Sequence, residues 1–147
     1  MTIPAAARDI AILLARVAVG AMFVEQGLQK LATVGIPAVA GSFEHAGVPF
    51  PVVAAWFAAT VETVGGVALI AGAAVPVVGL LLVADMVGVL FFVYIANGMY
   101  VENNGYEFVL TLGAAALLLV AVGPGRYSVD GALTAWRAWR GRLAVAG

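Results

Sequence analysis

A single acid, Glu62, interrupts the apolar stretch of residues 52–74, which contains no other charge. Asp85 lies near the centre of the next apolar stretch, and Arg16 and Glu25 interrupt the first. Ionisable side chains in such surroundings are costly, and by default they indicate a function or a pairing with one another. A carboxyl in an apolar medium can bind and release a proton. Glu62 and Glu25 are therefore the candidate catalytic residues, in a proton-handling role.

The composition places these residues in a membrane. Hydrophobic residues make up 64% of the 147 residues and charged residues only 10%, and the mean hydropathy is +1.09. Soluble globular domains carry about 25% charged residues, so we predict an integral membrane protein without a separate soluble domain. Cysteine is absent, which excludes a disulfide or a thiolate metal site made by this chain. A redox role would need a bound cofactor or a partner, and a nucleic-acid partner is not expected.

We predict an all-α fold, an integral membrane four-helix transmembrane bundle formed by a single domain, residues 1–147. About 20 residues of helix cross the hydrocarbon core, and the apolar stretches place the spans at about residues 10–31, 52–74, 77–96 and 107–123. The first span is expected to be retained rather than cleaved, because Arg16 breaks the apolar run that a signal peptide needs.

The arginines predict the orientation. Arg8 precedes the first span and four arginines follow the fourth, in the tail of residues 124–147, whereas the loop between the third and fourth spans carries an acid and no base. Basic residues accumulate on the cytoplasmic side of membrane proteins. We therefore expect a multi-pass protein of the cell membrane, the inner membrane of a bacterium, with both termini and the tail in the cytoplasm.

Two further helices are expected outside the spans. A short helix at about residues 38–46, bounded by prolines and glycines, is predicted on the outer surface. In the tail, Asp130 can cap an amphipathic interfacial helix. Its apolar side consists of Leu133, Trp136, Trp139 and Leu143. Tryptophan and arginine suit the boundary between lipid and water, so this helix is either a lipid anchor or a docking helix for a cytosolic partner.

Depth along the helices suggests how the buried charges pair. With about 1.5 Å of rise per residue, Glu62 and Asp85 fall within roughly 2 Å of the membrane midplane, and Arg16 lies about 6 Å toward the cytoplasm. We predict that Arg16 reaches Asp85 or Glu62. Because three interior acids face one interior base, at least one carboxyl is expected to be neutral at pH 7. The network is then either a proton relay or a polar pin that fixes the packing.

Helical spacing predicts which faces are buried. Positions three and four apart from Glu62 form a stripe of mostly small residues, which lets another helix approach closely. The stripe consists of Ala55, Ala58, Ala59, Gly65, Gly66 and Leu69. The same spacing from Asp85 predicts a buried face made of Val78, Leu81, Leu82, Gly88, Val89 and Phe92. Glu62 should therefore face the interior, with Gly88 at a helix crossing.

Further polar residues are expected near the outer ends of the helices. Gln26 and Gln29 extend the intramembrane network from the first span. A separate outer-end cluster is predicted from Lys30, Tyr94, Asn97, Tyr106 and Glu107. Within it we expect Lys30 to pair with Glu107, since an acid must neutralise the one base at this end.

Short motifs along the chain resemble the DoxX family. The first span contains G-x-x-F at Gly20 to Phe23, followed by GLQKL at residues 27–31. The later motifs are AGVPFP at residues 46–51, ETVGG at 62–66, Asn97-Gly98, GYEF at 105–108 and GPGRYSVD at 123–130. They keep the family's order over nearly the whole chain. The recurrent family positions occupied here are Gly27, Lys30, Glu62, Gly65, Gly66, Asn97, Gly98, Tyr106, Glu107, Gly123, Pro124, Gly125 and Arg126.

The resemblance implies a small subunit of a larger redox system. DoxX proteins resemble the membrane subunits of thiosulfate:quinone oxidoreductase, and mycobacterial members are linked to a membrane-associated oxidoreductase complex with a superoxide dismutase and a thiosulfate sulfurtransferase. Many relatives carry histidine where this chain has Gln26, and often near Tyr94. Those two replacements remove candidate proton carriers or metal ligands. The remaining histidine, His45, lacks enough neighbouring ligands for a metal, so no metal site is expected.

Two functions follow from these observations. The first is a membrane oxidoreductase subunit that handles a quinone, with Phe23, Trp56, Phe92 and Tyr94 as candidates to cover its ring. The second is a non-catalytic scaffold whose charges fix the packing and whose tail recruits soluble enzymes. A transporter is a weaker third possibility, which would need more spans or a homo-oligomer. Under all three, the partners are the lipid bilayer and other protein subunits or copies.

Overall fold

The computed structural model describes residues 4–145, and all regular structure in this part of the chain is helical. The α-helices are α1 (Ala5–Leu28), α2 (Ile36–His45), α3 (Pro51–Ala71), α4 (Val75–Val89), α5 (Glu107–Val122) and α6 (Val129–Val145). Two π-helical turns extend α1 and α4: η1 (Gln29–Val34) and η2 (Leu90–Tyr94). Two 3₁₀ turns, η3 (Ile95–Asn97) and η4 (Val101–Asn103), follow before α5.

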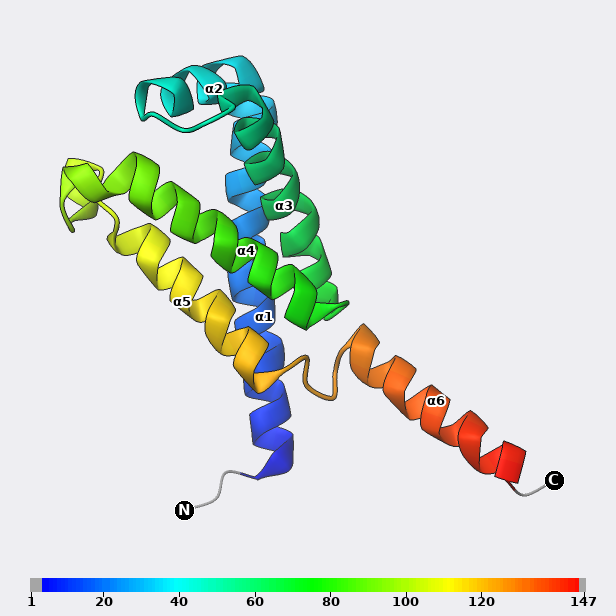
Figure 1. Cartoon of the computed structure of the whole chain (residues 1–147). Coiled ribbons are helices and arrows are strands. Elements are labelled where there is room, and N and C mark those ends of the chain that lie inside the picture. Colours follow the sequence, from blue (N-terminus) through cyan, green and yellow to red (C-terminus); the bar gives the residue numbers. More distant parts are fainter. Residues whose placement is uncertain (1–3, 146–147) are drawn as a thin grey trace.

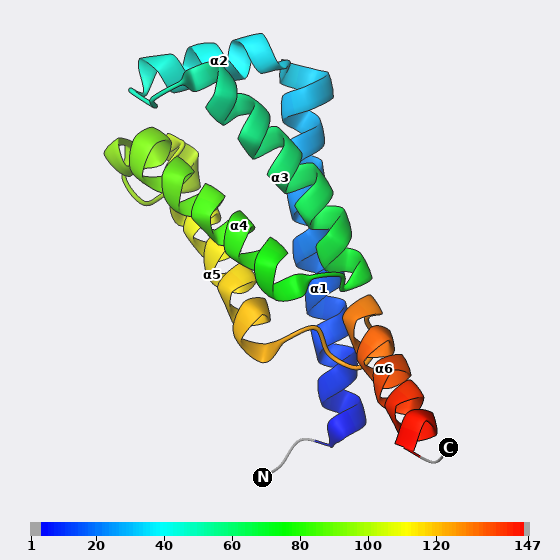
Figure 2. The same ribbon diagram turned by 45° about the vertical axis from the view of Figure 1, so that its right-hand side comes forward.

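The long helices are arranged in two antiparallel pairs. α1 packs along α3, α4 packs along α5, and α3 joins the pairs by contacting α4. The pairs meet near the turn between α3 and α4 and diverge toward α2, which lies across the ends of α1 and α3 (Figures 1 and 2). α6 leaves this helical body (α1 and α3 to α5) at the opposite end, where the described N-terminal residues also lie (Figure 1).

The α1–α3 contact depends on glycines that let the two backbones touch. A Cβ on Gly66 would lie 2.6 Å from the Gly20 carbonyl oxygen and 2.8 Å from the Val24 nitrogen. A Cβ on Gly27 would lie 2.6 Å from the backbone nitrogen of Thr63. Real Cβ atoms do not approach backbone atoms this closely, so these positions accept only glycine without a shift of the helices.

We expect Gly66→Ala to destabilise the protein by about 2 kcal/mol, because overpacking a tight helix contact forces the backbones apart. Gly88→Ala is the matched control, since a Cβ at this helical glycine meets nothing within 4 Å. Chemical unfolding in detergent micelles, followed by circular dichroism, measures both changes. Equal stabilities of the two variants would show that the α1–α3 crossing tolerates a methyl group.

The buried face of α3 is the one predicted from the sequence. Its buried residues are Ala55, Ala58, Ala59, Glu62, Gly65, Gly66 and Leu69. The small residues at the start of this face pack against α2, where Phe43 is buried. The face predicted for α4 is wrong in part: Leu82 and Asp85 are buried, but Val75, Gly79 and Met86 complete the face, and Leu81 is exposed. A Cβ on Gly88 would meet nothing within 4 Å, so Gly88 marks no helix crossing.

The helix boundaries differ from the predicted spans by a few residues. α3 ends at Ala71 rather than near Ala74, because Gly72 adopts a left-handed conformation with φ of 73° and stops the helix. α4 starts at Val75, where proline in the first turn suits a helix start. The outer-surface helix and the fourth span are close to their predicted bounds.

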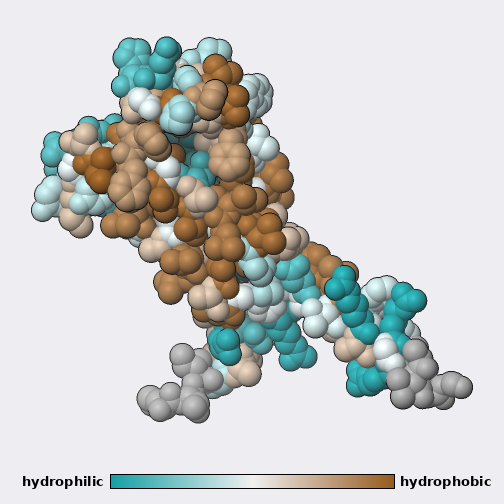
Figure 3. All heavy atoms as spheres, viewed as in Figure 1, coloured by the Kyte–Doolittle hydropathy of each residue, from teal (hydrophilic) through white to brown (hydrophobic). Residues whose placement is uncertain are grey.

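The middle of the molecule is covered by hydrophobic residues, and hydrophilic residues gather toward its ends (Figure 3). Within the described residues, two helical stretches are long and apolar enough to cross a membrane, Pro51–Ala71 and Val75–Asn97. The apolar helix Glu107–Val122 is shorter. These features agree with the predicted membrane protein.

The tail helix is capped differently from the prediction. Ser128, not Asp130, caps α6, since its hydroxyl oxygen accepts a hydrogen bond from the Gly131 N–H at 3.0 Å. The Asp130 carboxylate instead accepts the N–H groups of Ala74 at 2.9 Å and Val75 at 3.0 Å. Asp130 therefore caps the N-terminus of α4 and connects the first turn of α6 to the helical body.

Candidate functional site

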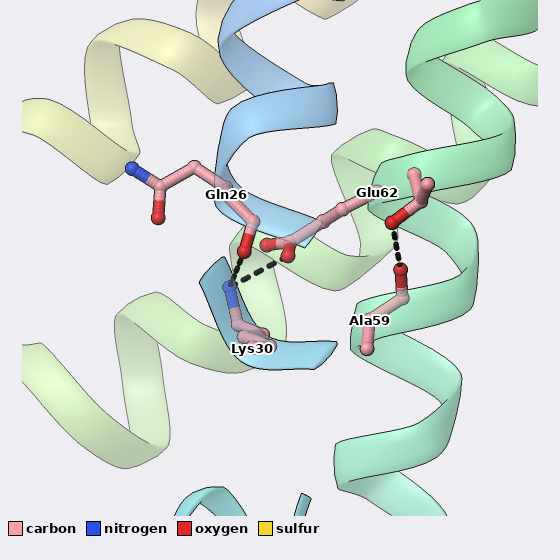
Figure 4. Close-up of polar contacts among 5 residues, drawn as sticks. Gln26, Lys30, Ala59 and Glu62 are labelled. Atoms are coloured by element: carbon pink, nitrogen blue, oxygen red, sulfur yellow. Dashed lines mark hydrogen bonds and ion pairs between the residues drawn. The ribbon is translucent and has the colours of Figure 1, made fainter. Parts of the chain in front are cut away.

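The centre of the candidate site is an ion pair between α1 and α3. Lys30 Nζ lies 2.6 Å from Glu62 Oε2, and the Glu62 side chain is only 1% exposed. The ammonium group also faces the Gln26 carbonyl oxygen at 3.5 Å, and Figure 4 shows both contacts at the end of α1. The predicted Lys30–Glu107 pair is wrong, because Glu62 lies nearer to the same ammonium group.

Asp85 adds a second carboxyl from α4. It is 6% exposed, and its carboxyl lies close enough to Glu62 and Lys30 to interact electrostatically with both. Its Oδ2 atom is buried and has no hydrogen-bond partner. The site therefore contains two carboxyls and one ammonium group, so one carboxyl lacks a base of its own. We call Lys30, Glu62 and Asp85 the carboxyl cluster.

The two π-helical turns place residues around this cluster. Lys30 belongs to η1, and Tyr94 ends η2. The Tyr94 hydroxyl lies close enough to the Glu62 carboxyl to interact with it electrostatically. The side chain of Tyr94 also packs against the buried core. Single π-helical turns within α-helices are frequent at functional sites, because the extra residue redirects the side chains that follow. The structure thus joins two groups that the sequence predicted separately: Glu62 and Asp85 of the interior, and Lys30 and Tyr94 of the outer end.

Arg16 does not join the cluster, and the predicted contact with Asp85 or Glu62 is wrong. Its guanidinium is 1% exposed and donates to backbone carbonyl oxygens: Ile70 at 3.3 Å, Tyr127 at 2.8 Å, and Pro124. These carbonyls end α3 and line the loop between α5 and α6, where Gly and Pro prevent a continuous helix. Arg16 therefore satisfies exposed carbonyl groups at the opposite end of the helical body from Lys30.

The remaining predicted residues lie outside the cluster. Glu25 and Gln29 are exposed on α1 and η1, and Gln26 takes part through its backbone oxygen. The α4–α5 loop uses its own polar groups to hold its shape: Asn97 Nδ2 donates to the Asn104 oxygen at 3.1 Å, and Glu107 Oε1 accepts the Val101 N–H at 3.2 Å. Tyr106 contributes a backbone bond to the Gly98 oxygen at 3.1 Å. The predicted outer-end cluster is therefore split.

A pocket of about 240 Å³ opens beside Asp85, between α2, α3 and α4. Its lining includes Phe43, Phe57 and Phe92, and Asp85 is the one charged residue among the lining residues. Of the four aromatic residues predicted to cover a quinone ring, Phe92 is the one among the lining residues. Phe23 is fully buried in the core and Trp56 is 53% exposed, so neither contributes to this pocket.

Phe43 and Phe57 were not predicted from the sequence to line a pocket. Phe43 belongs to the outer-surface helix, and its position relative to Asp85 depends on how the loop of residues 46–50 returns to α3. The helical spacing between Phe57 and Glu62 does not place them on one face of α3. A wall made from three separate helices leaves no periodic signal in any of them.

The DoxX family model matches residues 11–95. The chain belongs to the DoxX family. The matched region spans α1 to η2 and includes Lys30, Glu62, Asp85 and Tyr94. Family membership and the apolar helices together make the chain a membrane protein. The comparisons with curated proteins and with solved structures gave no match.

The site of this DoxX protein is suited to proton exchange. Two buried carboxyls that interact with each other and share one ammonium group cannot both be matched by that charge. Among the described residues, no group of three or more His, Asp or Glu side chains could hold a metal ion. The cluster and the nearby Tyr94 supply carboxyl, ammonium and phenol groups.

Proposed function

We propose that the chain is a four-span membrane subunit of the bacterial inner membrane, with both termini in the cytoplasm. Four antiparallel apolar helices and the basic residues near the α1 start and after α5 support this arrangement. Under this topology α2 and the carboxyl cluster lie toward the outer half of the membrane, and Arg16 and α6 lie toward the cytoplasm. α5, with 16 residues, is near the lower limit for a crossing.

The function that the site supports best is a quinone-linked oxidoreductase subunit. The carrying observation is the carboxyl cluster: a Lys30–Glu62 pair whose carboxylate is buried, with the unpartnered Asp85 oxygen in the same cluster. Quinone reduction consumes protons as well as electrons, and a carboxyl without its own base can deliver them. This chain has no cysteine that could relay electrons. The electrons would therefore come from a partner protein that oxidises thiols or other sulfur compounds.

The proposal predicts that quinone co-purifies with the protein in native-lipid nanodiscs and is reduced when the membrane supplies the electron donor. Asp85→Asn removes the carboxyl that has no base of its own; it should keep the bound quinone but lower its reduction by roughly a hundredfold, the typical contribution of a positioned acid or base. Glu44→Gln, at an exposed acid of α2, is the control. Nanodiscs that contain no quinone and reduce none would refute the proposal.

A scaffold is the second candidate, and it rests on α6. Trp136 and Trp139 are 51% and 54% exposed, so the apolar side of this helix lies on nothing within the described chain. Arg137 and Arg140 flank them, and the Arg140 guanidinium lies 4.8 Å from the centre of the Trp136 ring. Such a helix can lie at the membrane surface or bind a partner subunit or a second copy.

Removing residues 132–147 tests the scaffold. This truncation keeps Ser128 and Asp130, which cap α6 and α4, so the helical body should remain folded. We expect the partner proteins to be lost from the complex by native mass spectrometry, whereas Trp136→Ala with Trp139→Ala should reproduce the loss without shortening the chain. A complex that keeps its partners after both changes would assign α6 to lipid alone.

A further inference from the structure

The pocket beside Asp85 has one polar group in an apolar wall. Three phenylalanines from three segments, Phe43, Phe57 and Phe92, contribute to its lining, with Ala84 and Gly88 on the α4 side. The volume of about 240 Å³ suits a ligand with a fused aromatic ring or a similar apolar body. Apart from Asp85, the lining residues carry no charge and are mostly hydrophobic, so ligands of this pocket would enter from the lipid phase.

Asp85 is the one member of the carboxyl cluster that has a free acceptor. Glu62 is paired with Lys30 at 2.6 Å, and the second contact of the ammonium group goes to the Gln26 oxygen. Asp85 Oδ2 is buried without a hydrogen-bond partner, and the cluster contains one ammonium group for two carboxyls. What the site lacks is therefore a positive charge with an N–H group, placed on the pocket side of Asp85.

We propose that this pocket binds a lipophilic amine in its protonated form, an ammonium group attached to an apolar or aromatic body. The ammonium group pairs with the carboxyl of Asp85, which is among the lining residues, and neutralises the second carboxyl of the cluster. Its aromatic body fills the space between Phe43, Phe57 and Phe92, whose ring faces attract cations. An anionic ligand would be repelled by the two carboxyls. A neutral alcohol would donate a hydrogen bond but would not supply the positive charge. This assignment needs no quinone and stands apart from the redox proposal.

Binding of two matched compounds tests the proposal. Naphthylmethylamine carries the ammonium group, and naphthylmethanol has the same ring with a neutral hydroxyl. Both are titrated calorimetrically into the full chain in nanodiscs, with empty nanodiscs subtracted. We expect the amine to bind roughly tenfold more tightly than the alcohol, since a charge-assisted hydrogen bond is about twice as strong as a neutral one. Equal binding of the two compounds overturns the proposal.

Two variants locate the binding site. Asp85→Asn should remove the preference for the amine and leave the alcohol nearly unchanged. Gly88→Leu places a side chain where a Cβ meets no neighbour within 4 Å, so it fills the pocket without touching the carboxyl, and it should weaken both compounds by at least about tenfold. Glu44→Gln is the control and should change neither. If Asp85→Asn does not fold, Gly88→Leu still tests the location of the binding site. Unchanged amine binding in Gly88→Leu would show that the amine binds outside this pocket.

Discussion

Lys30→Met is expected to destabilise the protein by about 3 to 5 kcal/mol, the typical cost of removing one partner from a buried ion pair. The change keeps the apolar stem of the side chain and removes the ammonium group that lies 2.6 Å from Glu62. Glu62 is 1% exposed, so water cannot replace the lost charge. Chemical unfolding in mixed micelles, followed by circular dichroism, measures the loss.

A second variant separates the charge effect from a packing effect. Lys30→Met combined with Glu62→Gln removes both charges, and we expect it to recover at least about 2 kcal/mol of the loss, since the uncompensated carboxylate is gone. Gln29→Met, at the exposed neighbouring position, is the control for the new side chain. A double variant as unstable as Lys30→Met alone would mean that Lys30 contributes through packing rather than through its charge.

Glu62 shows which part of the site the sequence could predict. The stripe of small residues around it defined a buried face, and the glycines of α1 pack against that face in the structure. Helical periodicity predicts such a face because it depends on one helix and on the size of its side chains. The prediction needed no knowledge of the partner helix.

The partners of the charges could not be predicted in the same way. The sequence places Arg16, Glu62 and Asp85 at compatible depths along their helices. Depth along a helix axis does not say in which direction around that axis each side chain points. The Arg16 side chain points toward the ends of α3 and α5, where carbonyl groups have no hydrogen-bond donor within the helix. For Lys30, the π-helical turn η1 alters the direction of the side chain, and regular spacing does not anticipate such a turn.

Arg16→Met is expected to destabilise the protein by about 3 kcal/mol, because three partly buried hydrogen bonds from the guanidinium to carbonyl groups are lost, at roughly 1 kcal/mol each. The guanidinium joins α1 to the Ile70 oxygen at 3.3 Å and to the Tyr127 oxygen at 2.8 Å, and it also contacts Pro124. Its loss should loosen the segment that leads into α6. Limited trypsin digestion of the protein in nanodiscs detects this as faster cleavage after Arg126, which is exposed in that segment.

Two comparisons show whether this loss of stability comes from the planar set of N–H donors of the guanidinium group. Arg16→Lys keeps the charge but not the planar set of donors, so one carbonyl can be satisfied and the others cannot. We therefore expect a loss of stability between those of the wild type and Arg16→Met. Arg8→Met, at an exposed arginine of the same helix, should change neither stability nor cleavage after Arg126. If Arg16→Lys were as stable as the wild type, a positive charge alone would suffice at this position, and the carbonyl contacts would add little to the attachment of α6.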